Sequence, residues 1–254
     1  FFLFVITIAL LFGCQSEVSQ NSVRTYTQLQ GKTMGTTYNI TYASEVDYQT
    51  AIDSVLKVVN SEVNTYDPNS TISKFNQSET GIDLGVTLED IDSENYSIRK
   101  HFIINFQEAT TIYEKTNGNF DPTVMPLVNY WGFGYTPKKT INAVDSAKVD
   151  SLRQFIGLDK VGYNNTQLSK INPAVQLDFS ALAKGYGVDE IGRLLESKGV
   201  QDYMVEIGGE VRARGKNKKN DYWNMGVNTP KEGAAMNELF AAIRLHNESI
   251  ATSG

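Results

Sequence analysis

The residues with the clearest chemical potential are crowded into one stretch, Leu177–Asp189, which reads LDFSALAKGYGVD. It places an aspartate, a serine, a lysine and two glycines between the end of an expected strand and a helix that continues through Leu195. Free N–H groups at the start of a helix attract anions, and Gly185 and Gly187 lower the steric bulk where a ligand could approach the backbone. The same stretch also fits a plain strand-to-helix connection with a surface lysine. Motifs elsewhere in the chain are needed to distinguish a ligand site from a plain connection.

Further polar, glycine-containing clusters lie far from this stretch in the sequence. They are Met34–Thr36, Thr65–Asp67, Asn119–Thr123 and Val205–Glu210. Taken singly, each is also compatible with a turn, a helix N-cap or a core aromatic residue. Their joint meaning depends on whether the fold brings them together.

The common catalytic motifs are absent from the sequence. It contains no GxxxxGK[ST] loop, no GxGxxG, no HExxH and no paired CxxC, so ATP, dinucleotide and zinc motifs have no support. It also lacks a GxSxG elbow, which removes the usual hydrolase serine. The two histidines, His101 and His246, fall in a helical pattern and at a strand end, and we interpret both as structural or solvated.

Composition limits the class of partner. The chain has 254 residues, of which 41% are hydrophobic, enough to fill the core of one large domain or two small ones. The net charge of −6 disfavours a nucleic-acid partner, because binding to phosphates normally requires a basic face.

The N-terminal segment predicts export and lipid attachment. Residues 1–13 form an apolar run that is too short to span a membrane and fits the central region of a signal peptide. The run ends at Cys14, the only cysteine, in a Leu-Phe-Gly-Cys sequence that resembles a bacterial lipobox, although Phe12 is bulkier than usual there. An ordinary signal peptide with an incidental thiol is the alternative. Residues 14–30 are polar and predict a lipidated tether ahead of a folded part over residues 31–254.

The hydrophobic periodicity of the folded part predicts an α+β fold. Period-two alternation predicts a strand over residues 34–42, and helical spacing predicts helices over residues 50–63, 96–115 and 145–157. Helices early and strands late, without strict βαβ alternation, favour a largely antiparallel sheet with flanking helices. The segment 118–134 is rich in glycine, proline and aromatics without a clear period, so it is either a structured loop or the wall of a binding site. The predicted later strands cover residues 160–163, 167–171, 175–177, 203–207, 211–213, 222–227, 239–245 and 249–252.

Taken together and in this order, the clusters resemble the ApbE family, the FAD:protein FMN transferases. The resemblance runs from about Gly31 to Gly254 and implies a mixed, T-fold-related α+β domain. Proteins of this family are often lipoproteins exported to face the periplasm, in agreement with the separate interpretation of Cys14. The motifs that carry the resemblance are KTMGTTY, NTYDPNSTISKFN, GNFDPTVMPLVNYWGFG, LDFSALAKGYGVDEIGRLLESKG, EIGGEVRARG and ESIATSG.

The resemblance implies a reaction and its partners. Such enzymes bind FAD, cleave its pyrophosphate with the help of magnesium, and transfer FMN to a serine or threonine hydroxyl of a target protein with release of AMP. The implied acceptor is a subunit of a redox-driven membrane complex, and the implied location is the periplasmic side of a bacterial cell envelope, with a lipid anchor in the membrane. An FAD pyrophosphatase that releases free FMN, a non-catalytic FAD-binding lipoprotein and a structural or adhesive surface lipoprotein are the alternatives.

The resemblance also assigns residues. Positions that match FAD contacts in the family are Met34, Tyr66, Asn119, Phe120, Asp121, Asp178 and Lys184. Ala181 matches a magnesium ligand, a role that an alanine can fill only through its backbone carbonyl. The catalytic residue stays unassigned, because the family's histidine and most of its metal ligands are expected after the threonine-serine-glycine turn, beyond Gly254. We therefore expect the 254-residue chain to hold magnesium poorly and to be inactive, and a longer form to be active.

Overall fold

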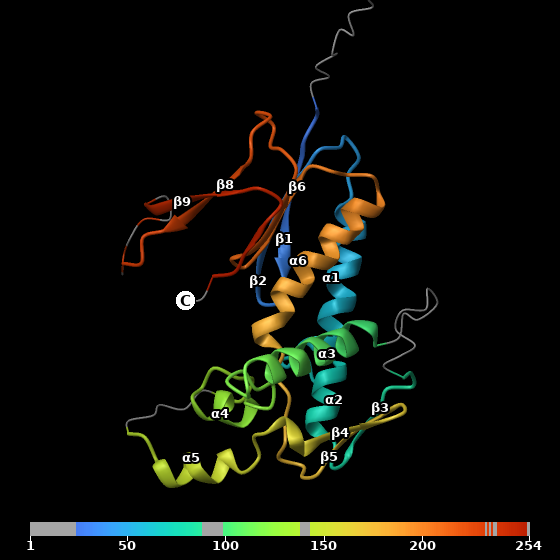
Figure 1. The fold of residues 1–254 in the computed structure, drawn as a ribbon, viewed down its shortest axis with the longest axis vertical. Coiled ribbons are helices and arrows are strands. Elements are labelled where there is room, and N and C mark those ends of the chain that lie inside the picture. Colours follow the sequence, from blue (N-terminus) through green and yellow to red (C-terminus); the bar gives the residue numbers. More distant parts are fainter. Residues whose placement is uncertain are drawn as a thin grey trace, which may run out of the picture.

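The computed structural model describes residues 24–87, 99–137, 143–231, 233, 235 and 238–252. They form an upper layer built on a five-stranded sheet and a lower layer of helices around a three-stranded sheet (Figure 1). Every pair of neighbouring strands in the sheets is antiparallel. The predicted α+β class with a largely antiparallel sheet and flanking helices is confirmed.

The main sheet has the order β1-β2-β6-β7-β10. Its strands alternate buried and exposed side chains, so each strand presents one residue set to each face. The register pairs Thr33 with Thr36 in the first hairpin and Ile207 with Glu210 in the second, which leaves two residues in each turn. The strands are β1 (Thr27–Thr33), β2 (Thr36–Tyr42), β6 (Tyr203–Ile207), β7 (Glu210–Arg214) and β10 (Ser249–Ile250).

Two long helices cover one face of the main sheet. Helix α1 (Gln49–Val63) and helix α6 (Ser180–Ser197) run side by side along it (Figure 1). Both are amphipathic, and their apolar stripes meet the inward side chains of β2 and β6 in one buried cluster. That cluster contains Ile40, Ile52, Leu56, Val188, Ile191, Leu195, Val205 and Ile207, among others.

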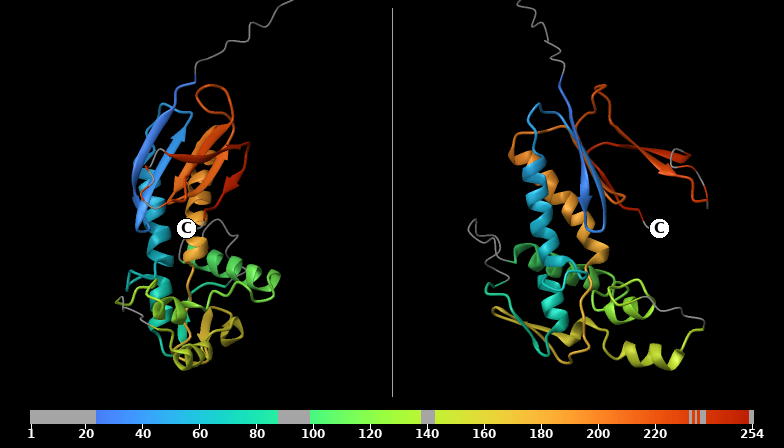
Figure 2. Two further views of the ribbon diagram at one scale, coloured as in Figure 1. Left: turned by 90° about the vertical axis from the view of Figure 1, so that its left-hand side faces the viewer. Right: turned by 180° about the vertical axis from the view of Figure 1, so that it is seen from behind.

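A separate hairpin packs against the opposite face of the sheet. It is formed by β8 (Trp223–Asn228) and β9 (Leu239–Leu245), and Figure 2 shows it on the side of the sheet away from the two helices. Trp223 and Leu245 are buried there against Val211 and Ala213 of β7. The sheet is therefore covered on both faces.

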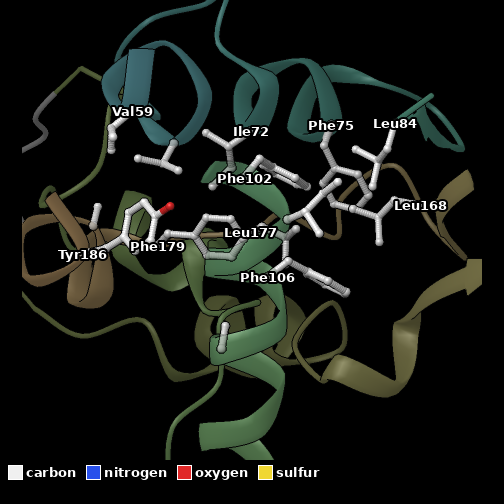
Figure 3. Packing of buried hydrophobic residues seen from close by; sticks show 14 of the residues in the cluster. Val59, Ile72, Phe75, Leu84, Phe102, Phe106, Leu168, Leu177, Phe179 and Tyr186 are labelled. Carbon is white, nitrogen blue, oxygen red and sulfur yellow. The ribbon is translucent and has the colours of Figure 1, made fainter. Parts of the chain in front are cut away.

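The lower layer has its own core, drawn in Figure 3. Phe102 and Phe179 lie at its centre with ring centroids 5.4 Å apart, surrounded by side chains such as Ile72, Phe75 and Leu177. Tyr186 of α6 also belongs to this cluster, so α6 joins the two layers. The elements of this layer are α2 (Thr71–Gln77), β3 (Gly81–Asp83), α3 (Lys100–Lys115), α4 (Met125–Tyr130), α5 (Ser146–Arg153), a 3₁₀ turn (Leu158–Lys160), β4 (Val161–Asn164) and β5 (Gln167–Lys170).

Several predicted boundaries need correction. The folded part does not start at Gly31, because β1 begins at Thr27 and is paired with β2 along its whole length, so the last residues of the predicted tether belong to the sheet. Residues 175–177 do not form a strand of any sheet. Gln176 forms an isolated parallel β-bridge with Val124 instead. The aperiodic segment 118–134 contains helix α4, which has a proline in its first turn.

The remaining differences concern helix α6 and predicted features that lie outside the described residues. Gly185 and Gly187 are not in a turn, because α6 already starts at Ser180. Cys14, residues 96–98 of the second predicted helix and the final Ser253-Gly254 lie outside the described residues. Within the described part of the chain, no helix combines the length and apolar character needed to cross a membrane.

Candidate functional site

Two hairpin tips meet beside helix α6. The turn between β1 and β2 is Met34-Gly35, with φ values of 48° and 74°, and the turn between β6 and β7 is Gly208-Gly209, with φ values of 53° and 95°. Positive φ at both central residues is typical of a type I′ turn, whose twist matches that of the flanking strands. Met34 is the one non-glycine residue among the four, and it adopts this uncommon conformation at a predicted FAD contact.

Close packing at glycines holds these tips against the helix. A Cβ atom on Gly187 would lie 3.1 Å from Met34 Cε, so the absence of a side chain there makes room for the methionine. A Cβ atom on Gly208 would lie 2.7 Å from Thr36 Cγ2 and 3.3 Å from Lys184 Cδ. The room that the sequence predicted at Gly187 is therefore occupied by the Met34 side chain. Gly185 is exposed and has nothing within 4 Å of such an atom, so the predicted approach of a ligand there stays a prediction.

A cavity of about 530 Å³ opens at this junction. It combines three of the predicted FAD-contacting residues, Met34, Tyr66 and Lys184, which come from segments far apart in the sequence. Its size falls within the range of pockets that hold organic cofactors, roughly 300–1,000 Å³. The other residues that line it are Gly35, Asn60, Val63, Asn64, Thr65, Ser180 and Ala183.

Tyr66 projects from a hydrogen-bonded loop between α1 and α2. Its backbone N–H donates to Asn64 Oδ1 at 2.9 Å, and Ser70, the N-cap of α2, donates from its hydroxyl to the Asn64 carbonyl at 2.6 Å. The Tyr66 side chain is 62% exposed, and its hydroxyl donates to the Phe133 carbonyl at 2.9 Å. Phe133 is 78% exposed. The open face of the Tyr66 ring is therefore held at the cavity by hydrogen bonds at both ends of the residue.

Lys184 is the cation of the cavity, and it has partners from the second hairpin. Its Nζ donates to the Gly208 carbonyl at 3.0 Å and lies 2.9 Å from Glu210 Oε1. The other oxygen of Glu210 accepts a hydrogen bond from the Thr252 amide at 3.3 Å. Glu210 thus links the lysine of α6 to the residues that follow β10. A cation fixed by one carboxylate and one carbonyl can still donate its third N–H to an anionic ligand.

The other predicted FAD contacts form a second group around the start of α6. The Asp178 amide donates to the Pro122 carbonyl at 2.7 Å, which places Asp178 beside the loop that follows α3. Asp178 is buried, and its Oδ1 accepts hydrogen bonds from the amide and the hydroxyl of Ser180, at 2.8 and 2.5 Å. Because Ser180 also lines the cavity, it connects this second group to the first.

The Asn119–Asp121 triplet follows helix α3 and the left-handed residues Asn117 and Gly118 that come after it. Asp121 accepts hydrogen bonds from the amide and hydroxyl of Thr123, at 2.8 and 2.6 Å, and Asn119 donates to the Thr116 carbonyl at 2.7 Å. Phe120 packs against the lower core. These three side chains are not among the residues that line the cavity.

The described residues do not form a magnesium site. Ala181 is exposed in the first turn of α6, where its carbonyl faces the N–H four residues on and keeps one lone pair for another partner. Magnesium requires near-octahedral oxygen coordination, usually with one or two carboxylates. No three His, Cys, Asp or Glu side chains gather at metal-binding distances in the described ranges. We derive no reaction step through a metal.

A buried polar cluster lies next to the cavity, where α1, α3 and α6 meet. Glu62 Oε2 accepts a hydrogen bond from the Phe102 amide at 2.9 Å, at the N-terminus of α3. Burial raises the pKa of Glu62 to about 7, against the opposing effect of backbone hydrogen bonds from Phe102 and His101. His101 Nδ1 lies 2.8 Å from the Tyr186 hydroxyl, and burial lowers the pKa of His101 and raises that of Tyr186. These contacts agree with the structural role predicted for His101.

Some residues of the site have little signal in the sequence. Asn60 and Asn64 line the cavity from successive turns at the end of α1, where polar residues are ordinary. Glu210 was part of a predicted cluster, but its pairing with Lys184 was not predicted. The two residues are 26 positions apart, and the β6–β7 turn places Glu210 beside α6. The contact between Tyr66 and Phe133 spans 67 positions. The aromatic residues of the segment 118–134 were the one hint of this contact in the sequence.

Comparison with known proteins is consistent with this geometry. Residues 34–254 match the ApbE family. The chain is 34% identical to the FAD:protein FMN transferase of Vibrio cholerae serotype O1 over 255 residues, which cover 98% of this chain and 70% of that protein. It is 35% identical to the FAD:protein FMN transferase of Haemophilus influenzae over 256 residues, with 96% and 68% covered.

Solved structures give the same result. The flavin transferase ApbE from Vibrio cholerae superimposes with a TM-score of 0.77 at 33% identity, covering 91% of this chain and 72% of that one. The ApbE protein from Thermotoga maritima superimposes with a TM-score of 0.70 at 25% identity, covering 91% and 71%. Sequence and fold agree over nearly the whole described chain, and the chain therefore belongs to the ApbE family, a family of transferase enzymes.

Proposed function

We propose that this protein is an FAD:protein FMN transferase, which cleaves FAD, transfers the FMN half to a serine or threonine hydroxyl of an acceptor protein and releases AMP. The observation that carries the proposal is the cavity at the hairpin tips, which unites Met34, Tyr66 and Lys184. These are three of the residues assigned to FAD by the family resemblance. The names of the relatives support the same activity.

The residues of the cavity suit the parts of FAD. The exposed ring of Tyr66 offers a flat face on which an isoalloxazine ring can stack, and the Met34 side chain provides a polarizable apolar contact. The ammonium of Lys184 is the charge that attracts the pyrophosphate, whose negative charge increases at the bridging oxygen as the bond breaks. Preorganised groups of this kind lower the barrier because they need not move during the reaction.

The proposal extends to the surroundings of the enzyme. It includes magnesium as an aid to pyrophosphate cleavage, an acceptor in a redox-driven membrane complex, and a lipid anchor at Cys14 on the periplasmic side of the cell envelope. These parts come from the resemblance and from the N-terminal sequence. Chelation of divalent cations, mass spectrometry of the acceptor and fatty-acid labelling of a Cys14→Ala variant test them one at a time.

The central experiment incubates the full-length protein, the longer form that is expected to be active, with FAD, magnesium and a purified acceptor domain. We expect covalent flavin on the acceptor, detected by in-gel fluorescence, together with AMP in equal amount. Lys184→Met is expected to weaken FAD binding about tenfold to a hundredfold, the effect of losing a charge-assisted hydrogen bond. Lys198→Met, at the exposed C-terminal cap of the same helix, is the matched control and is expected to bind normally.

The products separate the alternatives. Free FMN with AMP and no labelled acceptor would identify a pyrophosphatase and refute the transferase. Bound FAD without AMP would identify a non-catalytic flavin-binding protein. If FAD does not raise the melting temperature of the chain at all, the cavity is not a flavin site, since a ligand bound only by the folded state must stabilise it.

A further inference from the structure

Lys170 is a buried lysine whose three donors are all used by backbone carbonyls. It is the last residue of β5 and is only 6% exposed. Its Nζ donates to the carbonyls of Asn76, Pro173 and Val175 at 3.1, 3.0 and 3.0 Å. An ammonium has three N–H donors, so these carbonyls account for the whole group. Two of them belong to the segment that leads into the candidate site.

A second group fixes the same segment from helix α2. The side chain of Asn76 donates from Nδ2 to the Leu177 carbonyl at 2.8 Å and accepts at Oδ1 from the Leu177 amide at 2.7 Å. This paired arrangement reproduces what a neighbouring strand would offer to one residue. The next amide, that of Asp178, donates to the Pro122 carbonyl at 2.7 Å.

These contacts explain how residues 173–178 hold one shape outside the sheets. The segment has buried polar backbone groups that must be satisfied, and an isolated bridge is its β-type pairing. The Lys170 ammonium and the Asn76 amide take the place of strand partners. The segment ends at Asp178, and Ser180, Ala183 and Lys184 follow in the first turns of α6 and line the cavity.

We propose that Lys170 is a positioning residue for the flavin-nucleotide site, where its ammonium, together with Asn76, fixes the segment 173–178 and thereby the placement of Asp178 and the first turns of α6. Lys170 does not contact the ligand. This inference rests on the proposed function, because it assigns the positioned residues to FAD binding.

The charge state of Lys170 gives the proposal a property that a purely structural residue lacks. The groups that face Nζ are uncharged: the three carbonyls from α2 and from the segment, and the Phe75 ring, whose centroid is 5.2 Å away. Burial alone lowers the pKa of Lys170 to about 8. The ammonium predominates at pH 7 and the amine at pH 9. An amine has two donors, so one of the three buried carbonyls loses its partner as the pH rises.

The test compares FAD affinity at pH 7 and pH 9 in the full chain and three variants, by quenching of flavin fluorescence. We expect the wild-type dissociation constant to rise about tenfold or more over this range. Lys170→Met is expected to bind weakly at both values without a pH step, and Lys170→Arg, which keeps the charge, to lack the step while binding better than Lys170→Met. Lys74→Met, exposed on α2, is the matched control and should reproduce the wild-type profile.

Hydrogen exchange supplies a second measurement that needs neither a variant nor FAD. Relative to the amides of α1, the Leu177 and Asp178 amides of the wild-type chain are expected to lose protection between pH 7 and pH 9. Equal affinity in Lys170→Met and wild type, or a wild-type chain whose affinity and protection ignore pH, would overturn the proposal. A chain that binds no FAD at pH 7 but shows the loss of protection would refute the proposed function and leave the role of Lys170 in fixing the segment intact.

Discussion

We expect Glu62 of α1 to make the free energy of unfolding depend on pH. Its side chain is 7% exposed, and its Oε2 accepts a hydrogen bond from the Phe102 amide at the start of α3. Burial raises the pKa of this carboxyl from its usual 4.5 to about 7 in the folded state. Between these values the folded chain binds a proton that the unfolded chain has lost. The free energy of unfolding therefore decreases as the pH rises through this window.

The size of the effect follows from the same two pKa values. Their difference corresponds to about 3 kcal/mol, present in full below pH 4.5 and lost above pH 7. A Glu62→Gln variant keeps an oxygen acceptor for the Phe102 amide but cannot ionise. We expect it to match the wild type near pH 4.5 and to exceed it by about 2–3 kcal/mol at pH 8.

Urea denaturation monitored by circular dichroism measures this difference at several pH values between 4.5 and 8. His101, whose pKa is lowered by burial, titrates in both proteins, so subtraction removes most of its contribution. Glu108→Gln, at an exposed position of α3, is the control and should not change the pH dependence. If the difference between Glu62→Gln and the wild type is the same at pH 4.5 and pH 8, the carboxyl is not held in a desolvated environment and the reasoning is refuted.

Three further predictions concern the cavity and are measured by titration with FAD. Tyr66→Phe loses the hydrogen bond to the Phe133 carbonyl but keeps the ring, so the affinity should change less than about threefold, whereas Tyr66→Ala should lose about tenfold; equal losses would argue against stacking. Gly187→Ala should weaken binding, because the new Cβ displaces Met34, and unchanged affinity would contradict that contact. Glu210→Gln removes the carboxylate that pairs with the lysine of α6 and should strengthen binding about two- to fivefold; weaker binding would mean that the carboxylate orients the cation rather than competing with the ligand.

The sequence predicted the regular elements well wherever a strong period was present. The helix ending at Val63 and the strand Leu239–Leu245 were found with their ends nearly in place, because their less exposed residues recur at the period of their structure. The helix predicted to begin at Asp145 begins there, with Asp145 as its N-cap, whose side chain accepts a hydrogen bond from the Lys148 amide. These features depend on local interactions, which a sequence records directly.

The errors fall where tertiary contacts replace local patterns. Residues 175–177 resemble a strand because apolar Val175 and Leu177 flank Gln176. Their backbone, however, is satisfied by the side chains of Lys170 and Asn76, which no periodicity can reveal. Gly185 and Gly187 suggested a turn, whereas the helix accepts them and uses one for the approach of Met34. In both cases the missing information is the identity of a distant partner.

The sequence predicted which residues form the candidate site, but it predicted their arrangement in space only in part. Met34, Tyr66 and Lys184 line one cavity, and their contact with FAD stays a prediction. The triplet Asn119–Asp121 and Asp178 form a neighbouring group whose side chains bind mainly to their own loops. The resemblance supplies residue roles but no distances, so this division could not be predicted.

The pairing of Asn76 with Leu177 also limits when this part of the chain can fold during its synthesis. The two residues are 101 positions apart. At a synthesis rate of about 5–20 residues per second, the ribosome needs roughly 5–20 s to add the second residue after the first. Until Leu177 is made, the Asn76 amide has only water as a partner for these two bonds, and β5 with Lys170 is added only near the end of that interval. The nucleotide site therefore acquires its shape on the ribosome well after the first hairpin and α1 have been made.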